Sequence, residues 1–281
     1  MLPMHPPPAQ VPADDAEGFA SLIDKIARDR EFPCGSYKER CLRRRIGVRM
    51  RAKGVHTFAD YARVLDADAV EYDRLLDALT INVTKLFRNW EVWSAVAERV
   101  VPAVWALPDA ELRVWSAGCA SGEEPYSIAA LFHRHAERLG EAWRAERVQV
   151  LASDIDRASL VAAERGAYAE AAFADAPPEL RARYFSTEVP STVAPELRAM
   201  VRFERRDMLR DGPPPGTFHL VVCRNVIIYF DRASQERLFL QFHDALRPDG
   251  FLLLGKVETL FGPARSRFAV VDQRERIYRR A

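Results

Sequence analysis

The spacing of apolar residues changes near the middle of the chain. Over residues 17–81 they recur at helical intervals, which predicts a bundle of short helices. From residue 112 to residue 258, short apolar segments alternate with amphipathic helical runs, which predicts a mainly parallel sheet with helices on both faces. Near the C-terminus, the segments RFAVVD and RERIYRR predict a final antiparallel pair of strands. The fold class that follows is α/β with an antiparallel edge, preceded by a small helical domain.

The stretch LRVWSAGCASGEEPYS, residues 112–127, carries the strongest local signal of the predicted sheet. It begins as a strand with apolar residues two apart, continues as a loop of small residues, and ends as the start of a helix. In open α/β sheets, ligands bind at the carboxyl ends of such strands, and small residues let the backbone approach them closely. We therefore expect Ala117 and Gly118 to line a ligand site.

The charges of this loop limit the class of ligand. Dinucleotide sites use the pattern G-x-G-x-x-G and bind a pyrophosphate at the helix N-terminus. This loop has only Gly118 and Gly122, and Glu123 and Glu124 begin the helix, where they would repel phosphates. A nucleoside with a positive centre and no phosphate fits better, and S-adenosylmethionine (SAM) is such a ligand. The alternative is an ordinary strand-to-helix turn whose acidic residues only interact with the helix dipole.

Polar residues follow two further predicted strands. The segment VQVLASD ends in Asp154, with Asp156 close behind, and an acid at this place typically binds ribose hydroxyls. One of the two aspartates could instead cap the following helix. The segment FHLVVCRNVIIYFD contains an apolar strand followed by Asn225, which we expect in the same cleft. In this segment Tyr229 could reach the reacting group, or it could be an aromatic residue of the core or rim.

A dense positive charge marks the predicted helix at residues 38–53. Its eight cations are Lys38, Arg40, Arg43, Arg44, Arg45, Arg49, Arg51 and Lys53. Glu39 is the only acid in this stretch, so the helix favours an acidic partner, and nucleic acid also fits this description. The alternative is a solvated helix face. Ser36 and Glu39 have the spacing of a capping box before this helix.

Composition excludes several other classes of protein. The chain has 281 residues, 48% of them hydrophobic, and a net charge of +1, which allows a sizeable core without a strong overall charge preference. It contains no membrane-spanning apolar run and no signal-peptide pattern, so we expect a cytoplasmic protein without membrane insertion. The four cysteines lack C-x-x-C spacing, which predicts reduced thiols and no metal site. The proline-rich residues 1–16 predict a disordered leader.

Several of these segments together resemble one family. SAGCASGEEPYS, VTKLFR, ASDID, CRNVIIYFD and the basic helix are similar to the CheR family of chemoreceptor glutamate O-methyltransferases, over about residues 18–280. The resemblance implies a Rossmann-like SAM-methyltransferase domain that carries a short β-subdomain insertion. The expected domains are a leader at 1–16, a helical domain at 17–81, a linker and connecting helix at 82–105, and a SAM-binding domain at 106–281 with the insertion at about 168–199.

The resemblance also implies a site and a reaction. Its motifs assign to the SAM pocket the residues Asn82, Thr84, Arg88, Glu124, Asp154, Asp207, Met208, Asn225 and Val226. Arg88 and Tyr229 match the residues nearest the methyl group and the substrate carboxylate. The implied reaction is attack of a glutamate carboxylate, on the cytoplasmic helical bundle of a chemoreceptor, on the sulfonium methyl group, giving a methyl ester and S-adenosylhomocysteine (SAH). The implied receptor-binding residues are Arg40, Arg43, Arg44 and Arg51.

The sequence departs from the family pattern in three places. Leu86 stands where a phenylalanine is common, and Val257 replaces a hydroxyl residue in the segment 255–258. The insertion is short and contains Pro190 and Pro195, so we expect no tethering of a receptor tail peptide there. We also expect a monomer that forms no stable complex with nucleic acid.

Two other functions fit parts of the sequence. A CheR-like module could bind SAM or a signalling partner without transferring a methyl group. Val257 and Leu86 favour this alternative, whereas the intact Arg88 and Asp154 disfavour it. A methyltransferase acting on RNA would also carry a basic patch beside a SAM fold, but residues 38–53 contain few aromatic side chains that could stack on bases.

Overall fold

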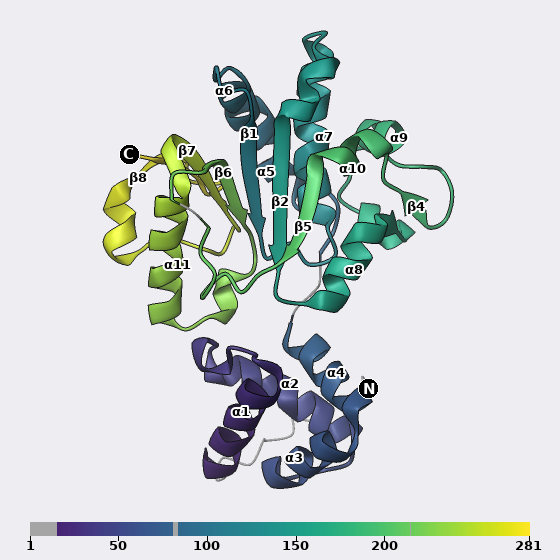
Figure 1. Cartoon of the computed structure of the whole chain (residues 1–281), viewed down its shortest axis with the longest axis vertical. Helices are drawn as coiled ribbons and strands as arrows, with labels where there is room; N and C mark the ends of the chain where they lie inside the picture. Colours follow the sequence, from purple (N-terminus) through teal and green to yellow (C-terminus); the bar gives the residue numbers. More distant parts are fainter. Residues whose placement is uncertain (1–15, 81–83, 214) are drawn as a thin grey trace, which may run out of the picture. The chain divides into compact units, whose positions relative to one another are not determined.

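The computed structural model describes residues 16–80, 84–213 and 215–281 (Figure 1). Asn82, one of the residues assigned to the SAM pocket, lies outside the described residues, as does almost all of the expected leader. Within the described ranges, no helix has both the length and the apolar character that crossing a bilayer requires.

The first of two compact units contains the chain up to Ile81 together with Tyr229–Asp231. Its described α-helices are α1 (Ala16–Arg30), α2 (Glu39–Ala52), α3 (Phe58–Ala67) and α4 (Ala69–Leu79). Their apolar faces meet in a core that contains Phe19, Leu22, Ile26, Leu42, Ile46, Tyr61 and Leu75. Thr57 and Asp68 fix the starts of α3 and α4, because each side chain accepts a hydrogen bond from a backbone N–H three residues further on.

The segment Tyr229–Asp231 belongs to the helical unit although it lies far along the chain. Tyr37 pairs with Phe230 as an antiparallel bridge, and the two rings pack edge-on with centroids 4.9 Å apart. Asp231 donates its backbone N–H to the carbonyl oxygen of Ser36 at 2.9 Å. The residues just before α2 and this distant segment therefore form a short antiparallel pair.

The second unit contains Asn82–Ile228 and Arg232–Ala281 and is built around a sheet with the strand order β5-β2-β1-β6-β7-β9-β8. Its strands are β1 (Leu112–Ala117), β2 (Val148–Asp154), β5 (Val201–Arg205), β6 (Phe218–Cys223), β7 (Leu246–Leu254), β8 (Phe268–Asp272) and β9 (Ile277–Arg280). Neighbours from β5 to β7 run parallel, whereas β9 runs antiparallel to β7 and β8. The predicted mainly parallel sheet with an antiparallel edge is confirmed.

Helices cover both faces of this sheet, as predicted (Figure 1). On one face, Val114 of β1 shares a core cluster with Leu131 of α7 (Glu123–Arg138). On the other face, the neighbouring Trp115 packs against Phe242 of α11 (Arg232–Ala245), with ring centroids 5.6 Å apart. Successive residues of a strand point to opposite faces, so β1 is buried on both sides. The other helices that precede or follow the first strands are α5 (Trp90–Ala95), α6 (Val101–Trp105) and α8 (Arg157–Arg165).

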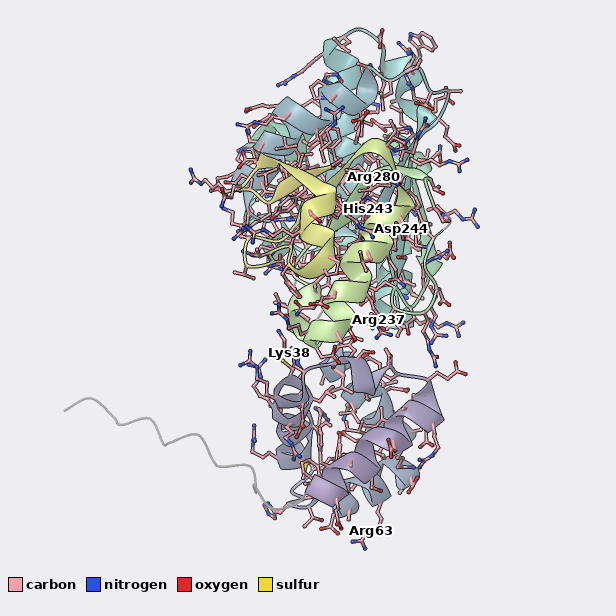
Figure 2. All side chains as sticks on the ribbon, turned by 90° about the vertical axis from the view of Figure 1, so that its left-hand side faces the viewer. Lys38, Arg63, Arg237, His243, Asp244 and Arg280 are labelled. Carbon is pink, nitrogen blue, oxygen red and sulfur yellow. The ribbon has the colours of Figure 1, made fainter. Side chains whose placement is uncertain are left out.

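Polar side chains lie along α11, as Figure 2 shows for Arg237, His243 and Asp244. The Nδ1 atom of His243 lies 2.9 Å from Asp244 Oδ1. The His243 ring also packs edge-on against Phe268, with ring centroids 5.5 Å apart. His243 therefore has a packing role.

The insertion between α8 and β5 is small. It contains β3 (Ala167–Tyr168), α9 (Pro178–Tyr184), β4 (Ser191–Thr192) and α10 (Pro195–Met200), and β3 and β4 form a two-stranded antiparallel sheet. Thr192 donates its backbone N–H to Ser186 Oγ at 3.0 Å, and its carbonyl oxygen accepts from the Ser186 N–H at 2.9 Å. The backbone of Thr192 is thus already paired within the insertion.

Candidate active site

The loop after β1 closely approaches residues from three other segments. Gly118 and Cys119 donate their backbone N–H groups to the carbonyl oxygen of Ser153 at 2.8 and 3.0 Å. Gly118 has a φ of +81°, and a Cβ atom added there would lie 2.7 Å from Val226 Cγ2 and 3.2 Å from Met208 Cε. Both the backbone conformation and the close approach require glycine at this position. The fold thus brings Gly118, Met208 and Val226 together.

Asp154 and Asp156 have separate roles at the end of β2. Asp154 is 8% exposed, and its Oδ2 accepts the Ala120 N–H at 2.8 Å while its Oδ1 accepts the Asp156 N–H at 2.9 Å. Asp156 caps α8, because its side chain accepts the Ala158 N–H at 2.9 Å. Burial raises the pKa of Asp154, and the N–H donors oppose that shift. The choice that the sequence left open is settled in part: Asp156 is the helix cap.

The two glutamates that begin α7 have different surroundings. Glu124 Oε1 accepts from Ser116 Oγ at 2.9 Å, and its Oε2 lies 3.9 Å from Arg224 Nη1. Burial raises the pKa of Glu124 to about 7, with Arg224 opposing the shift. Glu123 instead accepts from Ser121 Oγ at 2.8 Å, within its own loop. Glu124 is therefore a largely buried carboxyl, and the charge of Arg224 beside it affects its pKa.

Arg224 connects several of these segments, although the sequence assigned it no role. The side chain is buried, and its Nη2 donates to the carbonyl oxygen of Arg88 at 2.9 Å. Its guanidinium lies 4.9 Å from the ring centroid of Trp93, and its Nε has no hydrogen-bond partner among the described residues. The sequence does contain a signal for this role, because the charged Arg224 directly follows the apolar run LVVC.

The residues before Arg88 anchor it to the core. Leu86 and Phe87 are both fully buried. Leu86 donates its backbone N–H to the carbonyl oxygen of Ala172 at 2.9 Å, and Phe87 donates its N–H to Ser127 Oγ at 2.8 Å. Arg88 itself is partly exposed. Leu86 therefore occupies a core position, where its departure from the family pattern exchanges one apolar side chain for another.

Asp207 and Met208 follow β5. Asp207 Oδ1 accepts the Leu209 N–H at 2.9 Å, whereas its buried Oδ2 has no hydrogen-bond partner in the described part of the chain. An unpaired buried acceptor of this kind is available to a ligand donor. Of the other residues assigned to the pocket, Thr84 is half-buried and Ala117 is fully buried at the end of β1.

Tyr229 lies in the helical unit. The guanidinium of Arg45 lies over its ring, 5.3 Å from the centroid. Arg45 Nη1 also donates to the carbonyl oxygen of Ala78 at 2.6 Å, and burial lowers the pKa of Arg45. Arg45 is one of the eight cations of the basic helix, but these contacts engage it inside the unit.

Some of the other cations of the basic helix α2 contact neighbouring side chains, and others are exposed to solvent. Arg43 Nε donates to Glu39 Oε1 at 2.6 Å, and its guanidinium lies 3.9 Å from the ring centroid of Phe19. Arg49 and Lys53 form ion pairs with acidic residues at the start of α4. Three exposed cations of α2 have no side-chain ion pair or hydrogen bond to any described residue: Arg40, Arg44 and Arg51.

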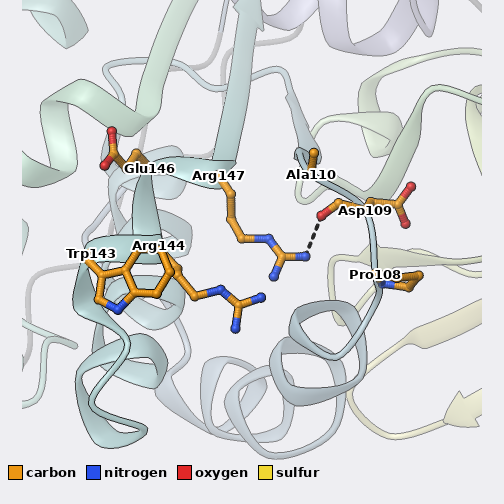
Figure 3. A pocket seen from close by; sticks show the side chains of 7 residues that line it. All are labelled: Pro108, Asp109, Ala110, Trp143, Arg144, Glu146 and Arg147. Atoms are coloured by element: carbon orange, nitrogen blue, oxygen red, sulfur yellow. Dashed lines mark hydrogen bonds between the residues drawn. The ribbon is translucent and has the colours of Figure 1, made fainter.

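A surface cavity of about 470 Å³ is lined by residues that directly precede β1 and β2 (Figure 3). It therefore lies at the amino ends of these strands, whereas the residues assigned to SAM follow the carboxyl ends. Trp143, Arg144 and Arg147 are among its lining residues, and Arg147 Nη2 donates to the carbonyl oxygen of Asp109 at 2.6 Å. The cavity contains none of the residues assigned to the SAM pocket. Among the residues that the structure describes, no three His, Cys, Asp or Glu side chains gather as a metal site requires.

Two family models match the chain. Residues 82–277 match the SAM-binding domain of CheR methyltransferases, and residues 17–80 match the all-alpha domain of the same methyltransferases. The chain belongs to the CheR methyltransferase family. The resemblance inferred from the motifs is confirmed, and SAM is the cofactor and methyl transfer the reaction of this class.

Curated relatives support the same assignment. The chemotaxis protein methyltransferase of Listeria innocua is 34% identical over 85% of this chain and 88% of its own length. Chemotaxis protein methyltransferase 1 of Pseudomonas aeruginosa is 32% identical over 88% of this chain and 90% of its own length. An uncharacterized 104.1 kDa protein of Rhodobacter capsulatus is 35% identical over 94% of this chain, which spans only 28% of that protein.

The side chains at the carboxyl ends of the strands fit SAM. The cofactor has ribose hydroxyls, an ammonium group and a sulfonium centre but no phosphate. Asp154 is a buried carboxylate, Glu124 is a largely buried one whose side chain is 12% exposed, and the unpaired Asp207 Oδ2 is a further acceptor. Gly118 lies so close to Val226 that a side chain at position 118 would collide with it. These features suit a cationic nucleoside better than a dinucleotide.

Proposed function

We propose that this protein transfers the methyl group of SAM to glutamate side chains on the cytoplasmic helices of chemoreceptors, giving glutamate methyl esters and SAH. The observation that carries the proposal is the convergence of Gly118, Met208 and Val226 near the carboxylates of Asp154, which is buried, and Glu124, which is largely buried, in a chain of the CheR family. The names of the relatives, chemotaxis protein methyltransferases, support a chemoreceptor as the substrate.

Each carboxylate of the site is assigned one part of the cofactor. In the proposal, Asp154 accepts the ribose hydroxyls and Glu124 faces the ammonium group. The proposed pocket also includes nine other residues: Asn82, Thr84, Arg88, Ala117, Gly118, Asp207, Met208, Asn225 and Val226. SAM supplies an electrophilic methyl group on its sulfonium sulfur, and the protein contributes binding and orientation.

The acceptor needs no general base. A glutamate side chain has a pKa of about 4.3 and is already ionised at neutral pH. The enzyme must therefore hold the carboxylate oxygen, the methyl carbon and the sulfur in line. We assign to Arg88 the attraction and orientation of the carboxylate, and to Tyr229 a hydrogen bond that directs it. Too tight an ion pair with Arg88 would lower the nucleophilicity of the carboxylate.

The exposed part of α2 supports an acidic helical partner. Arg40, Arg44 and Arg51 are exposed and unpaired within the described residues, so their charges are available to an acidic surface. The insertion gives less support for binding a receptor peptide as an added strand, because the backbone N–H and carbonyl groups of Thr192 are already paired with Ser186. We therefore propose that the receptor is engaged through α2 without tethering of a tail peptide at β4.

The test has two stages. Calorimetric titration with SAH should show saturable binding by the parent and strong loss of affinity in an Asp154→Ala variant, with Asp156→Ala as a matched control that removes the cap of α8. The parent is then incubated with methyl-labelled SAM and receptor cytoplasmic fragments, and base-labile label is measured. A folded parent that does not bind SAH would contradict the proposal at its first step. SAH binding without label on any receptor fragment would favour a non-catalytic module, and salt-sensitive labelling of RNA would favour the third alternative.

A further inference from the structure

Glu258 lies four residues beyond β7 and is 3% exposed. Its Oε2 accepts the backbone N–H groups of Gly255 and Asn225 at 2.6 and 3.0 Å. Its Oε1 accepts those of Val226 and Ile227 at 3.0 and 2.9 Å. One buried carboxylate therefore binds the backbone of three consecutive residues in the loop after β6.

This arrangement stabilises an otherwise unfavourable loop conformation. Asn225 has a φ of +63°, a left-handed conformation that is uncommon for residues other than glycine. With the carboxylate in place, the N–H groups of Asn225, Val226 and Ile227 are paired with a charged acceptor. Burial raises the pKa of Glu258, and the backbone donors oppose that shift and favour the ionised form.

Gly255 is matched to the same arrangement. A Cβ atom added at Gly255 would lie 2.7 Å from Glu258 Oε2 and 2.8 Å from the Asn225 nitrogen. Both distances are too short, and one of the two atoms belongs to the backbone. Glycine at this position therefore allows the carboxylate to reach the loop. In contrast, Val257 is 70% exposed, so the residue that departs from the family pattern points away from this contact.

The loop that Glu258 binds forms part of the cofactor site. Val226 is the residue that Gly118 approaches most closely, and Asn225 is its neighbour. We infer that Glu258 is a positioning residue, which sets the place of Asn225 and Val226 against the loop after β1 and thereby the affinity for SAM. The inference rests on the proposed cofactor pocket but assigns a role to a side chain outside the set of residues assigned to that pocket.

Glu258→Gln tests this role because it keeps the shape of the side chain. A glutamine has one oxygen to accept hydrogen bonds, and its NH₂ group would face two of the four backbone donors. We expect SAH to bind at least about tenfold more weakly, since buried donors lose their acceptor. The KM for SAM should rise by a similar factor, whereas kcat at saturating SAM should change by less than about threefold. Val257→Ser, on the exposed neighbour, should match the parent.

Two further measurements keep the test decisive. Amide hydrogen exchange without ligand should show faster exchange at Asn225, Val226 and Ile227 in Glu258→Gln than in the parent. If Glu258→Gln does not fold, Gly255→Ala displaces the same carboxylate and should weaken SAH binding in the same direction. Parental SAH affinity in a folded variant would overturn the inference and leave the proposed function intact. A folded parent that does not bind SAH would overturn both.

Discussion

Arg49 of α2 binds both carboxylate oxygens of Glu71 in α4, with Nε–Oε1 and Nη2–Oε2 distances of 3.0 and 2.5 Å. The Glu71 side chain is fully buried, and Tyr61 Oη also donates to its Oε1 at 2.8 Å. Lys53 lies 3.9 Å from Glu71 Oε2 and binds Asp68 at 2.8 Å. Two of the eight cations of the basic helix thus hold the helical unit together, instead of facing a partner.

Removing Glu71 should destabilise the helical unit. Glu71→Ala leaves Arg49 and Tyr61 without their shared acceptor, and breaking a buried pair on one side costs about 3 kcal/mol. The free energy of unfolding is measured by urea denaturation followed by circular dichroism. Asp73→Asn is the matched control, because Asp73 is 67% exposed in its ion pair with Arg30 and should change stability little. Equal effects of the two changes would contradict a structural role for the Arg49–Glu71 pair.

The same pair predicts how stability depends on pH. Burial raises the pKa of Glu71, but the hydrogen bonds from Arg49 and Tyr61 outweigh burial and leave the pKa below its ordinary value of 4.5. The unfolded chain therefore binds this proton more readily than the folded chain. The contribution of Glu71 is present above pH 4.5 and is lost as the pH falls through the lower, folded-state pKa. Urea midpoints measured between neutral and acidic pH should fall more steeply for the parent than for Glu71→Gln.

The exposed and the engaged arginines of α2 should behave differently. Arg44→Glu should lower kcat/KM for a receptor fragment by about tenfold at low salt, with a smaller effect at high salt, because an exposed charge acts on association. Arg43→Ala should instead lower stability by about 0.5–1 kcal/mol through loss of its contact with the Phe19 ring. Methylation rates across a salt series and thermal unfolding separate the two effects. A salt-independent loss in Arg44→Glu would exclude receptor binding by this face.

The carboxyl of Glu124 predicts a pH dependence of cofactor binding. Burial raises its pKa to about 7, so the neutral acid predominates below that pH and the carboxylate above it. Since the proposed partner is the ammonium group, SAH affinity should increase from about pH 6 to about pH 8. Two neighbouring charges also act on this carboxyl: Arg224 lowers its pKa and Glu258 raises it. Calorimetry on Glu124→Gln should give weaker binding that varies less with pH.

Arg88 and Tyr229 should affect the chemical step more than cofactor binding. Arg88→Ala and Tyr229→Phe are expected to lower kcat for receptor methylation by about 10- to 100-fold, because each removes a group that orients the acceptor. SAH affinity should fall less for Tyr229→Phe than for Arg88→Ala, since only Arg88 is also assigned to the cofactor pocket. Arg88→Ala with parental turnover would remove that residue from the mechanism.

The sequence correctly predicted features that depend on local spacing. The alternation of short apolar strands with amphipathic helices predicted a mainly parallel sheet with helices on both faces, and the structure has this arrangement. The prediction was possible because the faces that an element buries determine the spacing of its apolar residues along the sequence. The cap of α3 is local in the same way, because Thr57 is of a residue type that favours the start of a helix. The capping box at Ser36 was wrong: α2 begins at Glu39 after Lys38, without a side-chain cap. Ser36 lies in a preceding 3₁₀ turn, and its carbonyl oxygen accepts from Asp231.

What the sequence by itself determined is therefore the type and order of the elements and the motifs at the strand ends. What only the tertiary structure decided is which charges are used internally. Arg49 finds Glu71, Arg224 reaches the carbonyl of Arg88, and Glu258 binds the loop at Asn225, each across a long separation in the chain. A buried charge needs a partner, and the tertiary fold determines which residue lies close enough to be that partner. The spacing of residues along the sequence does not contain this information.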